Sequence, residues 1–455
     1  MAKQRVLFIC AECGTEQTKW QGQCSACKSW NSLREVKSER VQSRGLQGEP
    51  QGAVKLSEVA VKKLSRLSSG QIEFDRVLGG GLVPGSVVLI SGNPGAGKST
   101  LLTQVSSFVS GTGPVLYVAG EESLAQVAIR ASRLSLPVEN LDIVSETSCE
   151  RLISIWRELA PNVVIVDSIQ VMFTENSDSS PGGVNQVRES ASMLINQAKA
   201  SNTVLILVGH VTKEGSLAGP RTLEHMIDTF ISLEGQSDSK FRLLRSIKNR
   251  FGPVNELGVF AMTEKGLREI KNPSSIFLSR SSELKPGSVV MVVWEGTRPL
   301  LLEIQALVDE SVLAQARRVV VGLEQNRLVM LLAILNRHGG LQVADQDVFV
   351  NAVGGIRISE TSSDLALLAS VISSFRNWIL PQDLVIFGEV GLSGEIRPVP
   401  NGQERIKEAF KHGFKTAIIP HGNRTSKLID KSIRTIPVKD LGEAITNLET
   451  LSSTN

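Results

Sequence analysis

The middle of the chain alternates short, continuous apolar runs with segments of helical length. The apolar runs are rich in β-branched residues and are bounded by polar or glycine-containing stretches. Strands that are buried on both faces have this pattern, because neither face of their sheet meets water. When helices join such strands, the sheet is largely parallel. We therefore predict strands at residues 87–90, 115–118, 163–166 and 204–208, with later strands of the same sheet at 230–233 and 241–247.

A second α/β pattern follows a polar, proline-containing boundary at residues 271–275 (KNPSS). Its apolar runs are strand-sized, and its helical segments carry apolar residues at three- and four-residue spacing. We predict strands at residues 288–294, 300–307, 384–389 and 415–419, and helices at 325–336, 363–375 and 402–411.

The beginning of the chain differs from both α/β regions. Residues 34–55 are charged, contain glycine and are nearly free of large apolar side chains, so they cannot support a core and are predicted to be a flexible linker. The chain has 455 residues, enough for about three domains at roughly 150 residues each. We predict a cysteine-containing module at 1–33, the linker at 34–55, a central domain at 56–271 and a C-terminal domain at 272–455.

Four of the five cysteines lie within the first 27 residues, as two Cys-x2-Cys pairs separated by ten residues. A Cys-x2-Cys turn points two sulfurs at one centre, and two such turns close a tetrahedral four-thiolate site. A structural zinc ribbon is favoured over unpaired thiols or a redox pair. The predicted zinc ligands are Cys10, Cys13, Cys24 and Cys27.

Aromatic and basic residues are interleaved around these cysteines: Lys19, Trp20, Lys28 and Trp30. Indole rings and cations in this arrangement can stack on nucleic-acid bases. The tryptophans could equally pack this small module, because so few residues can bury little apolar surface. The pattern leaves both interpretations open.

Residues 92–99 (GNPGAGKS) match the phosphate-binding loop G-x-x-x-x-G-K-[ST], between a predicted strand and a predicted helix from Thr100. Backbone N–H groups of such a loop wrap phosphates, and the helix N-terminus adds positive potential. Lys98 is expected to reach the β- and γ-phosphates, and Ser99 to ligate Mg²⁺. The predicted nucleotide-binding residues are Gly92, Asn93, Pro94, Gly95, Ala96, Gly97, Lys98, Ser99 and Thr100.

Acidic residues follow two of the predicted strands. Asp167 ends the strand at 163–166 and is expected to hold magnesium or its water shell. Glu121 and Glu122 follow the strand at 115–118, and one of them, with Glu122 favoured, is expected to polarise the attacking water. The alternative is a structural role, because acidic side chains at a helix N-terminus are stabilised by the helix dipole. His210, after the strand at 204–208, could sense the γ-phosphate or satisfy a loop carbonyl.

Composition narrows the function classes. Lys and Arg number 49 against 46 Asp and Glu, a net charge of +3, which excludes a histone-like or polybasic protein. No apolar run approaches the ~18 residues of a membrane span, and the N-terminus lacks the apolar stretch of a signal peptide. We therefore expect a cytoplasmic protein that has no membrane contact.

Three segments together resemble a known family. Residues 70–82 (GQIEFDRVLGGGL) and the phosphate-binding loop resemble RecA/DnaB-type motor ATPases. Residues 248–252 (KNRFG), behind a four-cysteine module, are similar to the RadA (Sms) family of bacterial DNA repair proteins, and residues 276–455, including 388–399 (GEVGLSGEIRPV), resemble the Lon protease domain. The resemblance covers nearly the whole chain. It implies an α/β fold with a zinc ribbon, a RecA-like ATPase domain around a largely parallel sheet, and a Lon-protease-like domain.

The resemblance also implies a function. Members of this family form hexameric rings that hydrolyse ATP and move along single-stranded DNA, driving branch migration of recombination intermediates beside the RecA recombinase. It places KNRFG at the subunit interface, where Lys248 and Arg250 would act on a neighbour's γ-phosphate like an arginine finger. Two polar loops, 174–184 and 212–223, are expected to face DNA, the second with Lys213 and Arg221 as phosphate contacts.

Two other functions are weighed against this one. A Lon-type protease needs a serine nucleophile and a lysine base, but the aligned positions hold Ser362 and Gln403, with Asp364 where a glycine is expected. A neutral amide cannot accept the serine proton, so we predict a proteolytically inert scaffold that orders the hexamer. Its arginines could bind DNA or form a solvated face: Arg317, Arg318, Arg327 and Arg337. A KaiC-like signalling ATPase would give no reason for the cysteine module or KNRFG.

Overall fold

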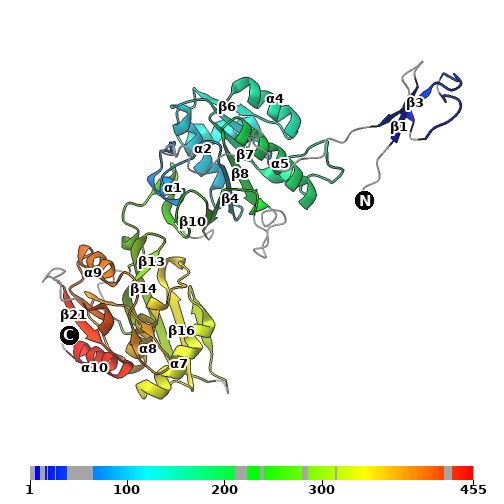
Figure 1. Cartoon of the computed structure of the whole chain (residues 1–455). Helices are drawn as coiled ribbons and strands as arrows, with labels where there is room; N and C mark the ends of the chain where they lie inside the picture. Colours follow the sequence, from blue (N-terminus) through cyan, green and yellow to red (C-terminus); the bar gives the residue numbers. More distant parts are fainter. Residues whose placement is uncertain are drawn as a thin grey trace, which may run out of the picture. The chain divides into compact units, whose positions relative to one another are not determined.

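The computed structural model describes residues 6–10, 16–17, 19–25, 27–37, 65–210, 223–235, 240–278, 285–312, 315–424 and 433–453 (Figure 1). The chain divides into two compact units, Met1–Val61 and Lys62–Asn455. The described residues include no helix that is both long enough and apolar enough to span a bilayer.

The first unit contains a three-stranded antiparallel sheet in the order β2-β1-β3. Its strands are β1 (Val6–Cys10), β2 (Glu16–Gln17) and β3 (Leu33–Lys37). Residues 34–37, expected at the start of the linker, instead lie in β3, because they pair in register with β1 from Arg34 opposite Ile9 to Lys37 opposite Val6.

The second unit begins with a nine-stranded sheet in the order β12-β11-β10-β9-β4-β8-β7-β5-β6. Strands β6, β5, β7, β8, β4 and β9 are parallel, and β10, β11 and β12 extend the sheet antiparallel. The bounds are β4 (Val87–Gly92), β5 (Val115–Ala119), β6 (Leu141–Val144), β7 (Val163–Asp167), β8 (Val204–His210), β9 (Thr229–Glu234), β10 (Phe241–Asn249), β11 (Leu257–Thr263) and β12 (Gly266–Glu269).

All six strands predicted for this sheet are present. The edge strand β6 was missed because it is only partly buried and lacks a continuous apolar run. Alternate residues of the central strands enter two cores on opposite faces: Val88 and Ile90 pack with helix α2, and Val87 and Leu89 pack with α4 and α5. The helices are α1 (Ile72–Val77), α2 (Lys98–Ser110), α3 (Leu124–Arg133), α4 (Cys149–Leu159) and α5 (Val184–Ala200).

The C-terminal region is built on a seven-stranded sheet in the order β15-β16-β14-β13-β17-β20-β21, with a separate ladder of β18 and β19. The strands are β13 (Ser288–Glu295), β14 (Arg298–Glu310), β15 (Arg318–Val321), β16 (Gln346–Ala352), β17 (Leu384–Ile386), β18 (Glu389–Val390), β19 (Ile396–Arg397), β20 (Thr416–Pro420) and β21 (Arg434–Val438). The helices are α7 (Gln325–Gly339), α8 (Asp364–Arg376), α9 (Gly402–Lys411) and α10 (Leu441–Ser452).

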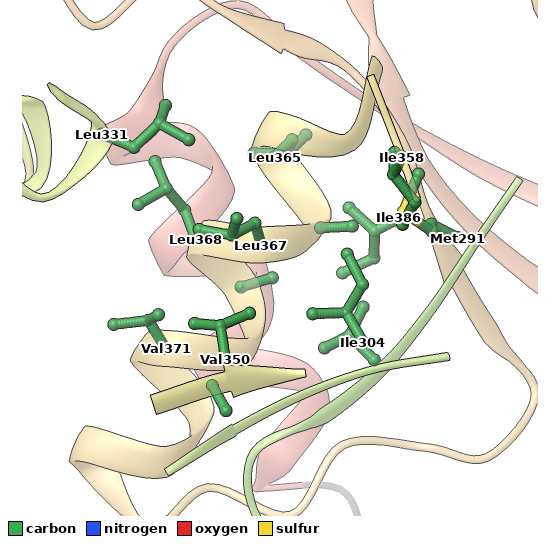
Figure 2. Packing of buried hydrophobic residues seen from close by; sticks show 14 of the residues in the cluster. Met291, Ile304, Leu331, Val350, Ile358, Leu365, Leu367, Leu368, Val371 and Ile386 are labelled. Carbon is green, nitrogen blue, oxygen red and sulfur yellow. The ribbon is translucent and has the colours of Figure 1, made fainter. Parts of the chain in front are cut away.

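Helix α8 lies against this sheet and fills its main core, where Leu368 and Val371 meet Val350 of β16 and Ile304 of β14 (Figure 2). The predicted strand at 384–389 is two strands, because the Gly388 amide leaves the ladder and donates to the Ser362 carbonyl at 2.9 Å. The three predicted helices are present, within three residues of their predicted ends.

Candidate active site

The phosphate-binding loop joins β4 to α2, as predicted. A Cβ atom at Gly92 would lie 2.4 Å from the Leu233 carbonyl oxygen, and Gly97, the N-cap residue of α2, lies in the left-handed region at φ +103°. Only glycine tolerates both positions without strain. The Lys98 side chain is buried, and its Nζ donates to the carbonyl oxygens of Gly92 at 2.7 Å and Asn93 at 3.2 Å. Burial lowers the pKa of Lys98, while the nearby carboxylates of Asp167 and Glu121 oppose that shift.

Asp167 lies at the carboxyl end of β7, beside β5, and its carboxylate is held by a phenol. The Tyr117 hydroxyl donates to Asp167 Oδ2 at 2.8 Å. Burial, followed by the charge of Asp167, raises the pKa of Tyr117 well above its ordinary value, so the phenol remains a donor. Sequence reasoning missed Tyr117. The available signal was a single polar side chain, the only tyrosine of the chain, inside a fully buried strand.

Glu121 and Glu122 are neighbours in sequence, but their side chains have different partners. Glu121 accepts a hydrogen bond from the Ser168 hydroxyl, and its Oε2 lies 3.4 Å from Nε2 of His210 at the end of β8. Glu122 forms an ion pair with Arg130 of α3. Glu121 therefore lies with Asp167 and His210 at the carboxyl edge of the parallel strands, whereas Glu122 is paired with a helix beside that edge.

The KNRFG segment lies at the opposite side of the same sheet, level with the amino ends of the parallel strands. Asn249, the last residue of β10, pairs with Thr229 at the start of β9, and Thr229 pairs with Val88 near the start of β4. The phosphate-binding loop begins at the opposite end of β4, where Gly92 pairs with Leu233. Val88 and Gly92 are four residues apart along β4, so about 13 Å of strand separates the level of Asn249 from the start of the phosphate-binding loop.

Both cations of KNRFG contact the segment before β9. Lys248 Nζ donates to the carbonyl oxygens of Glu224 at 2.5 Å and Ile227 at 3.0 Å, and Arg250 Nη1 lies 3.1 Å from Asp228 Oδ1. Burial lowers the pKa of Lys248, and the neighbouring Arg250 charge adds to that shift. Half of the Arg250 side chain, 51%, is exposed to solvent.

The glycine-rich lead-in packs directly on KNRFG. A Cβ atom at Gly79 would lie 2.9 Å from Gly252 Cα, and one at Gly252 would lie 2.8 Å from Gly79 Cα. Arg66 Nη2 donates to the Phe251 carbonyl at 2.6 Å. Two segments that carried the family resemblance therefore form one structural unit.

The structure describes part of the predicted zinc site. The Cys24 and Lys28 amides form a tight turn, with Cys24 N donating to Ser29 O and Lys28 N to Cys24 O, both at 2.9 Å, and Cys27 lies within this turn. Cys13 and the side chain of Cys10, which ends β1, lie outside the described residues. Trp20 and Trp30 are exposed by 58% and 72%, so their rings lie on the surface of the module and do not form its core.

The two predicted DNA-facing loops differ in what can be described. In the first loop, 174–184, Thr174 is buried and its hydroxyl donates to Glu150 Oε1 at 2.5 Å, so this end of the loop is anchored. The second loop, including Lys213 and Arg221, lies outside the described residues except for Leu223.

In the C-terminal region, Arg405 contacts Ser362, the serine that aligns with the protease nucleophile. The Ser362 side chain is 1% exposed, and its hydroxyl accepts from Arg405 Nη1 at 3.2 Å. Arg405 is fully buried and also contacts Glu360 and the Val292 carbonyl. Gln403 donates instead to the Asn423 carbonyl at 2.8 Å.

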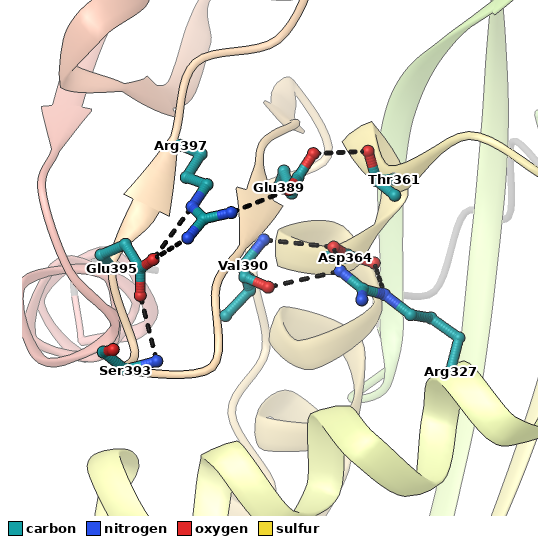
Figure 3. Close-up of polar contacts among 8 residues, drawn as sticks. All are labelled: Arg327, Thr361, Asp364, Glu389, Val390, Ser393, Glu395 and Arg397. Carbon is teal, nitrogen blue, oxygen red and sulfur yellow. Dashed lines mark hydrogen bonds and ion pairs between the residues drawn. The ribbon is translucent and has the colours of Figure 1, made fainter.

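The charged residues near this serine are also paired. Asp364, which stands at the expected glycine position, accepts from Arg327 Nε at 2.9 Å and from the Val390 amide at 3.1 Å (Figure 3). Burial raises the pKa of Asp364, while Arg327 opposes the shift. Arg317 pairs with Asp347, and Arg318 donates to the Val343 carbonyl at 2.9 Å. These three arginines therefore have structural partners.

Three family models match separate parts of the chain. The model described as an AAA domain matches residues 57–216, that of a rubredoxin metal-binding domain matches 8–35, and that of subunit ChlI of Mg-chelatase matches 295–423. These matches and the observed sheets confirm the predicted fold class: a zinc-ribbon module, a RecA-like central domain and a Lon-like α/β domain. A KaiC-like protein from Pyrococcus horikoshii aligns with 46% of this chain and 100% of its own at 18% identity and a TM-score of 0.39, which supports no functional argument.

Relatives match over nearly their whole length. The chain is 60% identical over 459 residues to DNA repair protein RadA of Haemophilus influenzae, covering 99% of this chain and 100% of the relative. It is 57% identical over 453 residues to that of Escherichia coli (98% of each chain) and 44% identical over 453 residues to that of Bacillus subtilis (98% and 99%). The chain therefore belongs to the RadA family of DNA repair proteins.

Proposed function

We propose that this chain is a DNA-dependent ATPase of recombinational repair, which translocates on single-stranded DNA and drives branch migration of recombination intermediates. Family membership supports DNA repair, and the match to an AAA domain supports ATP hydrolysis. The observation that carries the mechanism is the placement of the phosphate-binding loop and KNRFG at opposite edges of one sheet.

At the carboxyl edge, the loop residues 92–100 would bind ATP, with Lys98 reaching the transferred phosphoryl group. The present contacts of Lys98 with two loop carbonyls keep its ammonium at this place. The Ser99 hydroxyl and the Asp167 carboxylate fit Mg²⁺, a hard cation that prefers oxygen ligands and neutralises phosphate charge when bound. Tyr117 would orient the carboxylate of Asp167.

We assign the water-activating base to Glu121 in preference to Glu122. A base must lie within reach of the water that attacks the γ-phosphate, at the edge where Lys98 and Asp167 lie. Glu121 is close enough to oppose the shift in the pKa of Lys98, whereas Glu122 is neutralised by Arg130. His210, beside Glu121, would report on the γ-phosphate.

Lys248 and Arg250 would act on the nucleotide of a neighbouring subunit. Their position at the amino edge of the strands keeps them from the loop of their own subunit, and the half-exposed Arg250 can extend outward. A finger supplied in trans requires an oligomer, and the family resemblance implies a hexamer. Positive charge delivered to the γ-phosphate stabilises the transition state and couples hydrolysis to ring motion.

DNA contact is proposed for the loops at 174–184 and 212–223 and for the N-terminal module. The exposure of Trp20 and Trp30 favours stacking on bases over packing within the module. The resemblance adds the RecA recombinase as a partner and the bacterial cytoplasm as the location. The thiolates of Cys10, Cys13, Cys24 and Cys27 fit a structural zinc, because four soft ligands close a tetrahedral site. Elemental analysis of the purified protein is expected to find one zinc per chain.

The C-terminal region is proposed to be an inert protease scaffold. Ser362 is buried against a guanidinium, and an arginine, which stays protonated, cannot accept its proton. A Lon-like protease is therefore disfavoured by two residues, Arg405 and Gln403.

The deciding experiment measures ATP turnover with and without single-stranded DNA. We expect DNA to stimulate turnover in the full-length protein and unfolded protein substrates to remain uncut. A KaiC-like signalling ATPase would show no DNA stimulation, and a protease would show ATP-dependent cleavage. Either result would contradict the proposal.

A further inference from the structure

The connection that carries KNRFG is closed at its base by the two strands that flank it. The Ser246 amide of β10 donates to the Glu256 carbonyl at 3.0 Å, and the Asn255 amide donates to the Ser246 carbonyl at 2.9 Å. Residues 250–254 therefore connect the end of β10 to β11 above a closed base, and Arg250 begins this connection. Together with the contacts of Arg250 to Asp228, this base fixes where Arg250 lies.

The turn between β13 and β14, residues 295–298, lies against this base. Gly296 has φ +59°, and a Cβ atom there would lie 2.7 Å from Glu256 Cα and 2.9 Å from the Asn255 carbonyl oxygen. Such distances are too short for any side chain, so glycine alone allows the two backbones to meet. We name residues 295–298 the junction turn.

Two buried ion pairs flank Gly296 in the junction turn. Glu295 Oε2 lies 2.7 Å from Nη1 of Arg245 on β10, and Arg298 Nη1 lies 3.0 Å from Oε1 of Glu73 on α1. Burial raises the pKa of Glu295, opposed by Arg245, and lowers the pKa of Arg298, opposed by Glu73. Because both partners are desolvated, separating either pair would leave a buried charge uncompensated, so the pairs resist movement.

The strands around the loop share a core with the C-terminal sheet. Leu243, Leu257 and Val259 of β10 and β11 belong to the same buried cluster as Met291 and Val293 of β13. The junction turn is therefore part of a packed interface, which passes displacements on because close-packed interiors deform little.

We propose that Gly296, Glu295 and Arg298 are positioning residues, through which the C-terminal region sets the reach of Arg250 toward a neighbouring subunit's nucleotide. This inference rests on the proposed function, in which Arg250 acts in trans. It gives the inert Lon-like domain a task in each cycle of hydrolysis that is separate from assembly.

The test uses two glycine-to-alanine variants of the full-length protein. Gly296→Ala places a Cβ against Glu256, whereas Gly340→Ala, at φ +66° and with nothing within 4 Å of its Cβ, imposes a similar backbone strain without a contact. We expect Gly296→Ala to lower DNA-stimulated kcat about tenfold or more, because small misplacement of a catalytic group is costly. Affinity for ATP and ring size should stay native. Gly340→Ala should keep native turnover.

Mixed rings separate positioning from a general structural effect. A Gly296→Ala subunit keeps its phosphate-binding loop but has a misplaced Arg250. A Lys98→Ala subunit has a correctly placed Arg250 but a defective phosphate-binding loop. Mixing the two should restore turnover above that of either protein alone. Mixing Gly296→Ala with Arg250→Ala should restore nothing, because both lack the finger.

The control mixture is Arg250→Ala with Lys98→Ala. If it shows no recovery, the finger in trans, and with it the proposed mechanism, is wrong. If the control mixture recovers turnover, two results for Gly296→Ala would overturn the positioning role. One is native turnover of Gly296→Ala alone, and the other is that mixing Gly296→Ala with Lys98→Ala restores no turnover. Should Gly296→Ala fail to fold, Glu295→Gln takes its place, since the amide keeps the shape and an acceptor for Arg245. Native turnover in Glu295→Gln would then overturn the proposal.

Discussion

The carboxyl edge of the central sheet and the surroundings of Ser362 both contain several charged residues, yet the two places differ in how accessible their side chains are to solvent. At the sheet edge, the side chains of Glu121 and His210 are 38% and 34% exposed. Around Ser362, the hydroxyl-bearing side chain is 1% exposed and Arg405 is fully buried. A site that must admit a substrate leaves its polar groups accessible, whereas a scaffold buries them with partners.

The difference extends to how charge is balanced. Lys98 is a buried cation whose contacts are carbonyl oxygens, and the carboxylates of Asp167 and Glu121 are near enough to oppose the fall in its pKa. Arg405 has a direct carboxylate partner in Glu360 and several carbonyl acceptors. The first arrangement can exchange its contacts for phosphate oxygens, and the second has no need of an added ligand.

The largest effect is expected at Lys98. Lys98→Ala should reduce ATP turnover by about 10³-fold or more, because it removes the cation that meets the transferred phosphoryl group. Because burial already lowers the pKa of this lysine, the folded state gains little from the charge, and thermal unfolding should stay near native. Lys199→Ala, at an exposed position of α5, is the control for loss of a positive charge. Near-native turnover in Lys98→Ala would mean that the phosphate-binding loop is misassigned.

Glu121→Gln and Glu122→Gln test which of the two glutamates is the general base. Glu121→Gln should lower turnover by about 10²–10⁴-fold, the usual contribution of a general base. Glu122→Gln should have a smaller effect, because Glu122 already has Arg130 as its partner. Steady-state ATPase rates of the two proteins decide the assignment, and a larger loss in Glu122→Gln would reverse it.

Sequence reasoning located the strands and the phosphate-binding loop, because each leaves a local pattern. The buried strands and the Gly92–Ser99 motif predicted that Lys98, Asp167 and a glutamate would lie at one edge, because parallel strands bring their carboxyl ends together. It could not choose between Glu121 and Glu122, since the choice depends on Ser168 and Arg130, which lie far from each other in the sequence. The structure supports Glu121, although the sequence pattern favoured Glu122.

Tertiary arrangement explains the other omissions. The position of KNRFG at the amino edge follows from the reversal of β10 against β9, which no residue within the motif encodes. Arg405 lies in the helix predicted at 402–411, and its contacts with Glu360 and Ser362, more than 40 residues away in the chain, could not be seen from the sequence. Long-range pairs of this kind leave no periodic signal in a single sequence.

The ion pair between Arg327 and Asp364 in the C-terminal region should matter for stability alone. Arg327→Met would leave Asp364 buried without its partner, at a cost of about 3 kcal/mol, the lower end for breaking a buried pair. Arg337→Met, an exposed residue on the same helix, is the matched control and should change little. ATP turnover should remain native in both, and a large loss of turnover in Arg327→Met at a temperature where it is folded would contradict this.

The deficit of Arg327→Met should depend on pH. Asp364 already has a raised pKa in the folded protein, and loss of Arg327 removes the group that opposes the shift. A carboxyl group with a raised folded pKa binds protons more tightly when folded, so its contribution to stability is lost as pH rises through that pKa. Chemical denaturation should therefore show a smaller deficit in acid than at neutral pH.

The smallest effect is expected at Ser362. Ser362→Ala removes one acceptor from Arg405, which keeps the carboxylate of Glu360 and the carbonyls of Val292 and Pro400, so the loss should be about 1 kcal/mol. ATP turnover and its stimulation by DNA should be unchanged, because the serine is buried and the carboxyl edge of the central sheet is formed by other residues. Arg405→Met provides the contrast, since it removes the buried guanidinium that pairs with the Glu360 carboxylate, and the region should unfold at markedly lower denaturant concentration. ATP-dependent cleavage of an unfolded substrate by the intact protein, abolished in Ser362→Ala, would contradict this prediction. Ser362 would then be a nucleophile in spite of its burial and its contact with Arg405.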